Sequence, residues 1–164
     1  MIDRTLVWIK EVNKKYNIQP VRILDIGSQD TNGNPRHLFP SSEYVGIDIK
    51  KGMNVDRVMS VYELSAHFKE NSFDAVLCLN VFEHLKNIWV ALSEINFVLA
   101  SKGYFFVSIP TLGYPKHNYP KDYWRATEEA VRETIMDGYD ILSLEYGKSR
   151  FGKHPIIDCL GAKR

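Results

Sequence analysis

Residues 21–28 read VRILDIGS, and residues 44–49 read YVGIDI. Each stretch is a short, mostly apolar run that carries an acid near its end, Asp25 in the first and Asp48 in the second. Such runs predict buried strands of a parallel sheet. A loop containing Gly33 lies between them, so the backbone after the first strand can approach a ligand while Asp48 accepts hydrogen bonds from ribose hydroxyls. The pattern is typical of a nucleotide-type cofactor site at the ends of two neighbouring strands.

The bulk composition is that of an ordinary globular protein. Of the 164 residues, 45% are hydrophobic and 25% are charged, and the formal net charge is +1. These values fit one domain over residues 1–164 and indicate no global basic surface for nucleic acid. No apolar stretch has the length of a membrane span or the layout of a signal peptide, so no membrane association is expected.

The two cysteines indicate the redox environment. Cys78 and Cys159 lie within apolar runs, which is typical of buried thiols in a reducing compartment. A cytoplasmic location is therefore expected. No pair of cysteines or histidines has the spacing of a zinc site, so the sequence predicts no metal site.

Strand and helix patterns alternate along the chain. Strands are predicted at 21–26, 44–48, 56–59, 73–79, 104–109, 140–146 and 156–161, and helices at 2–16, 35–39, 62–68, 88–99 and 128–137. The connection between the first two strands is long enough for the crossover that parallel neighbours need, whereas the last two strands are joined too closely and must be antiparallel. The expected fold is α/β, a doubly wound, mostly parallel seven-stranded sheet with an antiparallel last strand.

This order of elements resembles the class I S-adenosylmethionine-dependent methyltransferases, in particular the small, single-domain, type 11-like members. The motifs that carry the resemblance are LDIGSQD at 24–30, Asp48, NSFDAV at 71–76, NVFEHL at 80–85 and DYWRAT at 122–127. Each motif alone is weak, but together they follow the order and spacing of the family over nearly the whole chain. The resemblance implies a Rossmann-like methyltransferase fold, S-adenosyl-L-methionine as the cofactor, and methyl transfer as the activity.

The resemblance also implies which residues bind the cofactor. Gly27 would let the backbone approach the methionyl part, Asp25 would orient that loop, and Asp48 would accept hydrogen bonds from both ribose hydroxyls. Asp25 equally fits a strand-end carboxylate that caps nearby amides. In this family an adenine-contacting acid often stands at the position of Ser60. The remaining cofactor candidates follow the ends of the predicted strands: Ser28, Ile49, Ser60, Val61 and Asn80.

The acceptor site is expected in the irregular segment 110–125, the one stretch without periodicity that is large enough to form a pocket. Methylation of a hydroxyl needs a base within hydrogen-bond reach, and the catalytic candidates are His117 and His84. A surface-loop histidine and a helix-entry hydrogen bond are the plain alternatives for these two. The candidates for substrate contact are Tyr119, Asp122, Trp124, Arg125 and, from the last loop, Arg150. Lysines and arginines in both loops would suit an anionic acceptor, although loops are also commonly basic for solubility.

Three functions remain open on the sequence. The leading one is O-methylation of a small-molecule or sugar-like acceptor. A non-catalytic partner subunit that binds the cofactor is the first alternative, because Gln29 and Thr31 replace glycines of the usual loop. An NAD-dependent dehydrogenase is the second, although the chain lacks the Gly-x-Gly-x-x-Gly pattern. The chain has no large inserted lid, which leaves open an acceptor site completed in a homo-oligomer or by a partner subunit.

Overall fold

The computed structural model describes residues 3–30, 33–117, 121–148 and 154–164. The strands are β1 (Arg22–Ile26), β2 (Glu43–Asp48), β3 (Arg57–Val58), β4 (Phe73–Leu79), β5 (Leu99–Pro110), β6 (Tyr139–Lys148) and β7 (Pro155–Lys163). The helical elements are α1 (Asp3–Tyr16), η1 (Pro35–Leu38), η2 (Val61–Glu63), α2 (Leu64–His67), η3 (Phe82–His84), α3 (Ile88–Val98), α4 (Glu128–Ala130) and η4 (Val131–Ile135).

The strands form one seven-stranded sheet in the order β3-β2-β1-β4-β5-β7-β6. Strands β1 to β5 are parallel, and β7 is antiparallel to both of its neighbours, β5 and β6. The predicted fold class is therefore confirmed. The strand order reverses between β1 and β4, so the carboxyl ends of these two strands flank the switch point where ligands bind in open α/β sheets.

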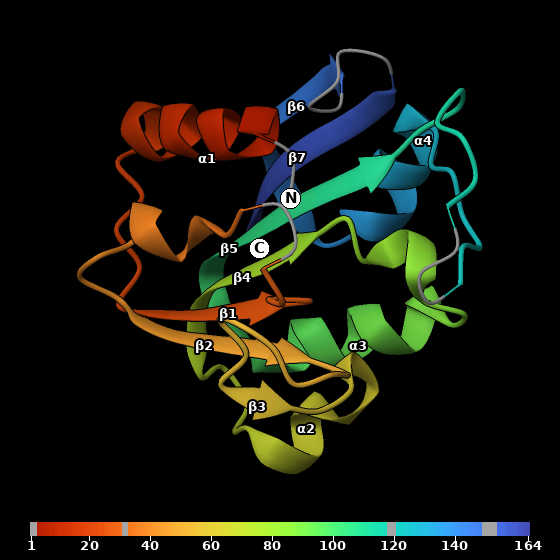
Figure 1. Cartoon of the computed structure of the whole chain (residues 1–164). Coiled ribbons are helices and arrows are strands. Elements are labelled where there is room, and N and C mark those ends of the chain that lie inside the picture. The colour runs from red at the N-terminus through yellow and green to blue at the C-terminus, as the bar shows by residue number, and fades with distance from the viewer. Residues whose placement is uncertain (1–2, 31–32, 118–120, 149–153) are drawn as a thin grey trace.

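Helices lie on both sides of the sheet (Figure 1), and apolar side chains fill the space on each face. Alternate residues of each central strand point to opposite faces, as Ile23 and Leu24 of β1 do. Ile23 packs with Trp8 of α1 on one face, and Leu24 packs with Ile95 of α3 on the other. Because both faces are buried, the central strands read as nearly continuous apolar runs, which is why the sequence predicts them well.

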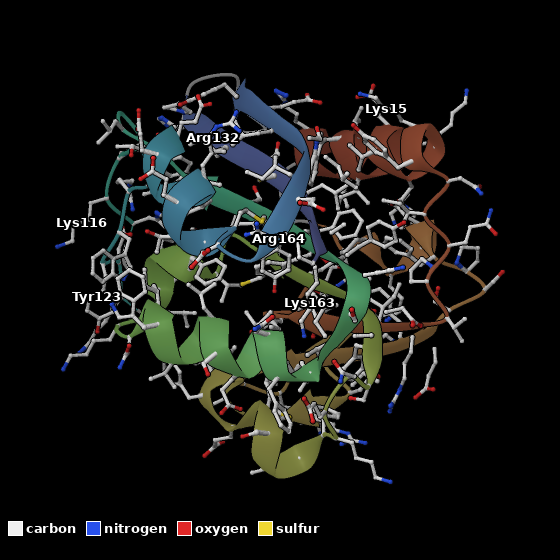
Figure 2. The ribbon with its side chains drawn as sticks, turned by 180° about the vertical axis from the view of Figure 1, so that it is seen from behind. Lys15, Lys116, Tyr123, Arg132, Lys163 and Arg164 are labelled. Carbon is white, nitrogen blue, oxygen red and sulfur yellow. The ribbon has the colours of Figure 1, made fainter. Side chains whose placement is uncertain are left out.

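The start of β5 differs from the prediction. The strand begins at Leu99 rather than at 104, directly after α3, so the interval between the predicted helix 88–99 and the predicted strand 104–109 lies inside it. Lys102 has a positive φ of 63°, and the pairing with β4 shifts register at this point, so these residues form a bulge. Lys163 of β7 donates to the carbonyl oxygens of Asn96 and Leu99 and so caps the end of α3. Figure 2, which views the molecule from behind, labels Lys163.

Candidate functional site

A pocket of about 220 Å³ opens at the carboxyl ends of β1, β2 and β4. Six of the predicted site residues line it: Gly27, Asp48, Ile49, Val61, Asn80 and His84. The remaining lining residues are Ile26, Gln29, Ile47, Lys50, Met59, Val81 and Leu85. The wall is mainly apolar, with polar groups at a few positions, which is the usual make-up of a cofactor pocket.

Gly27 shapes the floor of this pocket. Its φ is +74°, a conformation that favours glycine, and its amide donates to the Ile47 carbonyl oxygen at 2.8 Å. A Cβ at this position would lie 2.4 Å from Cγ2 of Val81. The turn after β1 thus packs against the chain leaving β4 so closely that only glycine fits.

Asp25 lies buried beneath the pocket and does not line it. Its Oδ2 accepts hydrogen bonds from the Tyr44 hydroxyl at 2.9 Å and from Asn34 Nδ2 at 3.3 Å. Asn34 Nδ2 also donates to the Ser28 carbonyl oxygen at 2.9 Å, which ties the loop after β1 to the carboxylate. Burial raises the pKa of Asp25 to about 7, against the lowering effect of its two donors. These contacts support the predicted role in orienting the loop, which stays a prediction.

The polar candidates at the strand ends lie in different settings. Asp48 ends β2 on the pocket wall, where its Oδ1 accepts from the Lys50 amide at 3.0 Å. Asn80 adopts a positive φ of 55° after β4, and its buried Nδ2 has no hydrogen-bond partner among the described residues. The same holds for the buried Ser28 hydroxyl. Ser60 caps η2 by accepting from the Tyr62 amide at 3.2 Å, so its hydroxyl is already engaged.

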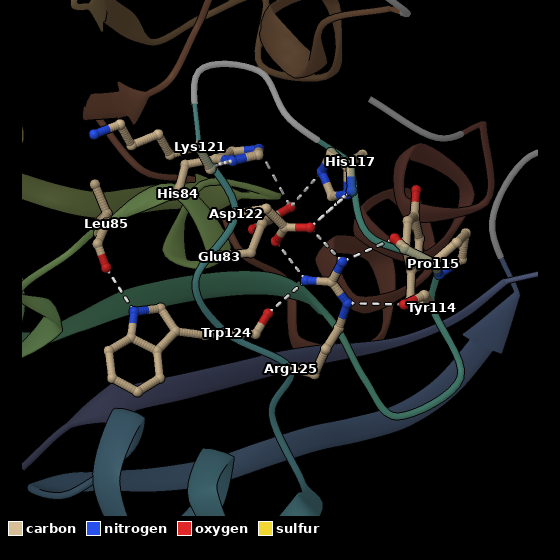
Figure 3. A network of polar contacts seen from close by, with 10 residues as sticks. All are labelled: Glu83, His84, Leu85, Tyr114, Pro115, His117, Lys121, Asp122, Trp124 and Arg125. Carbon is tan, nitrogen blue, oxygen red and sulfur yellow. Dashed lines mark hydrogen bonds and ion pairs between the residues drawn. The ribbon is translucent and has the colours of Figure 1, made fainter.

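A second group of polar side chains borders the pocket at His84 (Figure 3). Glu83 is fully buried, and its Oε1 lies 3.8 Å from Nε2 of His84 and 3.7 Å from Nε2 of His117. The nearby Glu83 carboxylate raises the pKa of His117. The structure therefore brings the two predicted catalytic histidines together around one carboxylate. Glu83 itself is not among the residues predicted from the sequence, since nothing in its spacing links it to residue 117.

Asp122 and Arg125 form a two-pronged ion pair in the same group (Figure 3). Nη1 of Arg125 lies 2.5 Å from Oδ1 of Asp122, and Nη2 lies 2.6 Å from Oδ2. Arg125 also donates to the carbonyl oxygens of Tyr114 and Pro115. The guanidinium holds the pKa of Asp122 well below its usual range. Both charges are thus occupied in holding the segment, and their predicted contact with an acceptor stays a prediction.

The other acceptor candidates are placed in part. Trp124 is 41% exposed, and its Nε1 donates to the Leu85 carbonyl oxygen at 2.6 Å. With Tyr114, Lys116 and Tyr123 it lines a shallow hollow of about 240 Å³ beside the Asp122–Arg125 pair. Tyr119 and Arg150 lie outside the described residues.

In the part of the chain that the structure describes, no helix is long and apolar enough to cross a membrane.

The fold and the pocket define a nucleotide-type cofactor-binding α/β protein, and comparison with known proteins narrows the class. Residues 24–107, just over half of the chain, match the methyltransferase-domain family. The chain belongs to this family. The resemblance to class I S-adenosylmethionine-dependent methyltransferases is confirmed, and with it the expected class of enzyme.

Solved structures show the same fold. 1,6-Didemethyltoxoflavin-N1-methyltransferase of Burkholderia thailandensis, crystallised with 1,6-didemethyltoxoflavin and S-adenosylhomocysteine, superposes with a TM-score of 0.79 at 14% identity, over 97% of this chain and 78% of that one. The N-methyltransferase NodS of Bradyrhizobium japonicum, crystallised with S-adenosylhomocysteine, gives a TM-score of 0.72 at 11% identity, over 98% of this chain and 86% of that one.

A curated relative matches over a short stretch. An uncharacterized protein of Methanocaldococcus jannaschii is 50% identical over 42 residues, which are 26% of this chain and 18% of that protein. The match thus spans less than a fifth of the relative's length.

Proposed function

We propose that residues 1–164 act as one domain that transfers a methyl group from S-adenosylmethionine to a hydroxyl of a small, sugar-like acceptor. One observation carries the proposal: His84 lines the apolar pocket and also contacts the Glu83 carboxylate, which His117 approaches as well. A cofactor pocket and a group of proton acceptors therefore share a wall.

The residues of the pocket fit this cofactor. Glycine at 27 lets the turn after β1 lie against Val81, so bare backbone rather than a side chain faces the methionyl part on the pocket floor. The buried Asn80 Nδ2 lacks a partner among the described residues and is free to donate to a ligand carboxylate. Asp48 presents its carboxylate at the end of β2 for the ribose hydroxyls, and Met59 and Val61 form an apolar wall for the adenine. The two solved neighbours named above were crystallised with S-adenosylhomocysteine, which supports the same cofactor here.

When bound, S-adenosylmethionine supplies an electrophilic methyl group on a positively charged sulfur. The chain's own task is to exclude water, to align the acceptor and to take up the proton of its hydroxyl. The apolar pocket wall serves the first of these. The group around Glu83 serves the last, because its imidazole nitrogens lie within reach of the pocket and can act as a general base.

The acceptor class is proposed from the hollow next to this group. Tyr123 and Trp124 are 42% and 41% exposed there, and exposed aromatic rings offer flat faces to sugars. Lys116 lies beside them and would attract an anionic group such as a phosphate. The predicted contribution of Arg150 to an anionic acceptor concerns a residue outside the described part. A nitrogen acceptor is the second candidate, since both named neighbours are N-methyltransferases.

The test is calorimetric titration of the full chain with S-adenosylhomocysteine, with NAD as the control ligand. We expect binding of the first alone, weakened by at least about tenfold in Asp48→Ala, because hydrogen bonds to a carboxylate are lost. Asp140→Ala, at an exposed position on β6, is the matched control and should bind normally. Absence of S-adenosylhomocysteine binding would refute the proposal.

Turnover separates the remaining functions. Methyl transfer to a panel of sugars, sugar phosphates and amines is followed by mass spectrometry, and the position of the new methyl group distinguishes oxygen from nitrogen acceptors. Cofactor binding without turnover across the panel would favour the non-catalytic partner subunit.

Cys78 and Cys159 are buried and unpaired, which accords with the proposed cytoplasmic setting.

A further inference from the structure

We infer that Glu83, His84 and His117 form a binding site for one divalent transition-metal ion such as Zn²⁺. One ligand atom from each residue, a carboxylate oxygen and two imidazole nitrogens, lies within 4.8 Å of the other two (Figure 3). Two ligands of one ion, each about 2.1 Å from it, lie at most about 4.2 Å apart. The observed separations therefore close around an ion with a side-chain shift of less than about 1 Å.

The histidines present the correct nitrogens. Nδ1 of His84 hydrogen-bonds the Lys121 carbonyl oxygen, which can only accept, so Nδ1 carries the proton. Nε2 of His84 then directs a lone pair at Glu83. His117 turns its Nδ1 toward Oδ2 of Asp122, 3.5 Å away, and its Nε2 toward the same Glu83 oxygen. Nδ1 of His84 is held by a carbonyl oxygen while its Nε2 faces Glu83, an arrangement typical of metal-bound imidazoles, and Nε2 of His117 faces the same carboxylate oxygen.

The state of Glu83 is an independent observation. The side chain has no exposed surface, and neither of its carboxylate oxygens has a hydrogen-bond partner among the described residues. A buried carboxylate without such bonds is costly unless it is paired or binds a metal. An ion at the centre satisfies all three groups.

The donor set indicates the class of ion. Two imidazoles and one carboxylate suit zinc, iron, cobalt or nickel, whereas Mg²⁺ prefers an all-oxygen shell. Three protein ligands leave coordination positions free for a small molecule. With the ion bound, the imidazole nitrogens are its ligands and no longer take up protons. Since His84 also lines the cofactor pocket, an acceptor hydroxyl on the ion would lie beside that pocket, and its lowered pKa would let its proton pass to water. That last consequence rests on the proposed function; the metal site itself does not.

The experiment is titration of the chelator-treated full chain with Zn²⁺, with Co²⁺ as a spectroscopic probe and Mg²⁺ as the control ion. We expect one Zn²⁺ per chain, and visible absorption bands when Co²⁺ binds. His117→Ala and Glu83→Gln should each weaken Zn²⁺ binding by about tenfold to a hundredfold or more. His67→Ala, an exposed histidine on α2, is the matched control and should bind as the unaltered chain does.

Absence of stoichiometric Zn²⁺ binding, or unchanged binding in His117→Ala, would overturn the inference. His117 is 36% exposed, so its replacement keeps the test valid even if the buried Glu83 variant fails to fold. Titration of the same samples with S-adenosylhomocysteine separates the two proposals. Zn²⁺ binding without S-adenosylhomocysteine binding supports the metal site and refutes the cofactor, and the converse result refutes the metal site alone.

Discussion

Asp25 and Glu83 are both buried carboxylates at the switch point of the sheet, one near the end of β1 and the other just after β4. Asp25 accepts hydrogen bonds from Tyr44 and Asn34, so the chain itself completes its surroundings. The Glu83 carboxylate accepts none from any described residue and faces two imidazole nitrogens instead. Burial alone therefore does not identify a carboxylate that binds a metal ion. The hydrogen bonds of Asp25 hold a loop in place, whereas both carboxylate oxygens of Glu83 remain able to bind an ion.

The largest effect is expected from the protonation of Asp25. Its pKa is raised to about 7 in the folded protein from an ordinary value of 3.8, so the folded state holds a proton that the unfolded chain has released. Stability should therefore fall as the pH rises from about 4 to about 7, by up to roughly 4 kcal/mol. Urea unfolding of the unaltered chain and of Asp25→Asn across this range measures the difference. Parallel profiles would show that the hydrogen bonds of Asp25 offset its burial.

The next effect concerns Gly27, which lies two residues after Asp25 and packs against Val81, two residues before Glu83. Gly27→Ala places a methyl group 2.4 Å from Val81 at a positive φ and should cost about 3 kcal/mol, from strain and overpacking together. Gly138→Ala is the control: φ is +85° there, but no atom lies within 4 Å, so about 1 kcal/mol is expected. Equal losses of unfolding free energy would show that packing against Val81 contributes nothing.

Glu83→Gln is expected to increase stability, whereas the glycine variants lower it. In the metal-free protein at pH 9, above the range where histidine is normally charged, removal of an unpaired buried carboxylate should raise stability by about 2 kcal/mol. Zn²⁺ should raise the melting temperature of the unaltered chain and should raise that of the variant much less. A loss of stability in the metal-free variant would contradict the unused binding capacity of Glu83.

The smallest effect is expected at the edge of the Glu83 group. Trp124→Phe removes the hydrogen bond from the indole nitrogen to the Leu85 carbonyl oxygen, at an exposed position, and should cost about 1 kcal/mol. Trp89→Phe is the matched control, because Trp89 is also an exposed indole, on α3. Thermal unfolding compares the two variants, and a larger loss at Trp89 would speak against the Trp124 contact.

The sequence predicts the centre of the fold better than its edges. The expected strands 21–26 and 73–79 agree with β1 and β4, since residues buried on both faces make apolar runs that need no tertiary information. The predicted helix at 35–39 begins at Pro35 as expected, with Asn34 as its N-cap, because the start of a helix depends on local chemistry. The predicted start of β5 is wrong because the bulge at Lys102 depends on pairing with β4, which the sequence of one strand does not reveal.

The site divides in the same way. Gly27, Asp48 and Asn80 follow predicted strands directly, so the parallel sheet brings them to one pocket without further assumptions. Glu83 meets His117 only because segment 111–126 folds back across η3, where the Tyr123 amide donates to the Glu83 carbonyl oxygen at 2.7 Å. Spacing rules for metal sites assume ligands on one local element, and these ligands come from two.

Segment 111–126 leaves the sheet and returns to it at a single point, since Thr111 and Ala126 form an isolated parallel bridge and the Ala126 amide donates to the Pro110 carbonyl oxygen at 3.1 Å. Lengthening a loop whose ends already meet costs little entropy, about 0.6 kcal/mol for each doubling. The length and sequence of this segment can therefore change while the sheet stays the same, provided that its contacts with η3 change with it. Homologues that differ in what they modify should differ here first, in both the length and the chemistry of the insert.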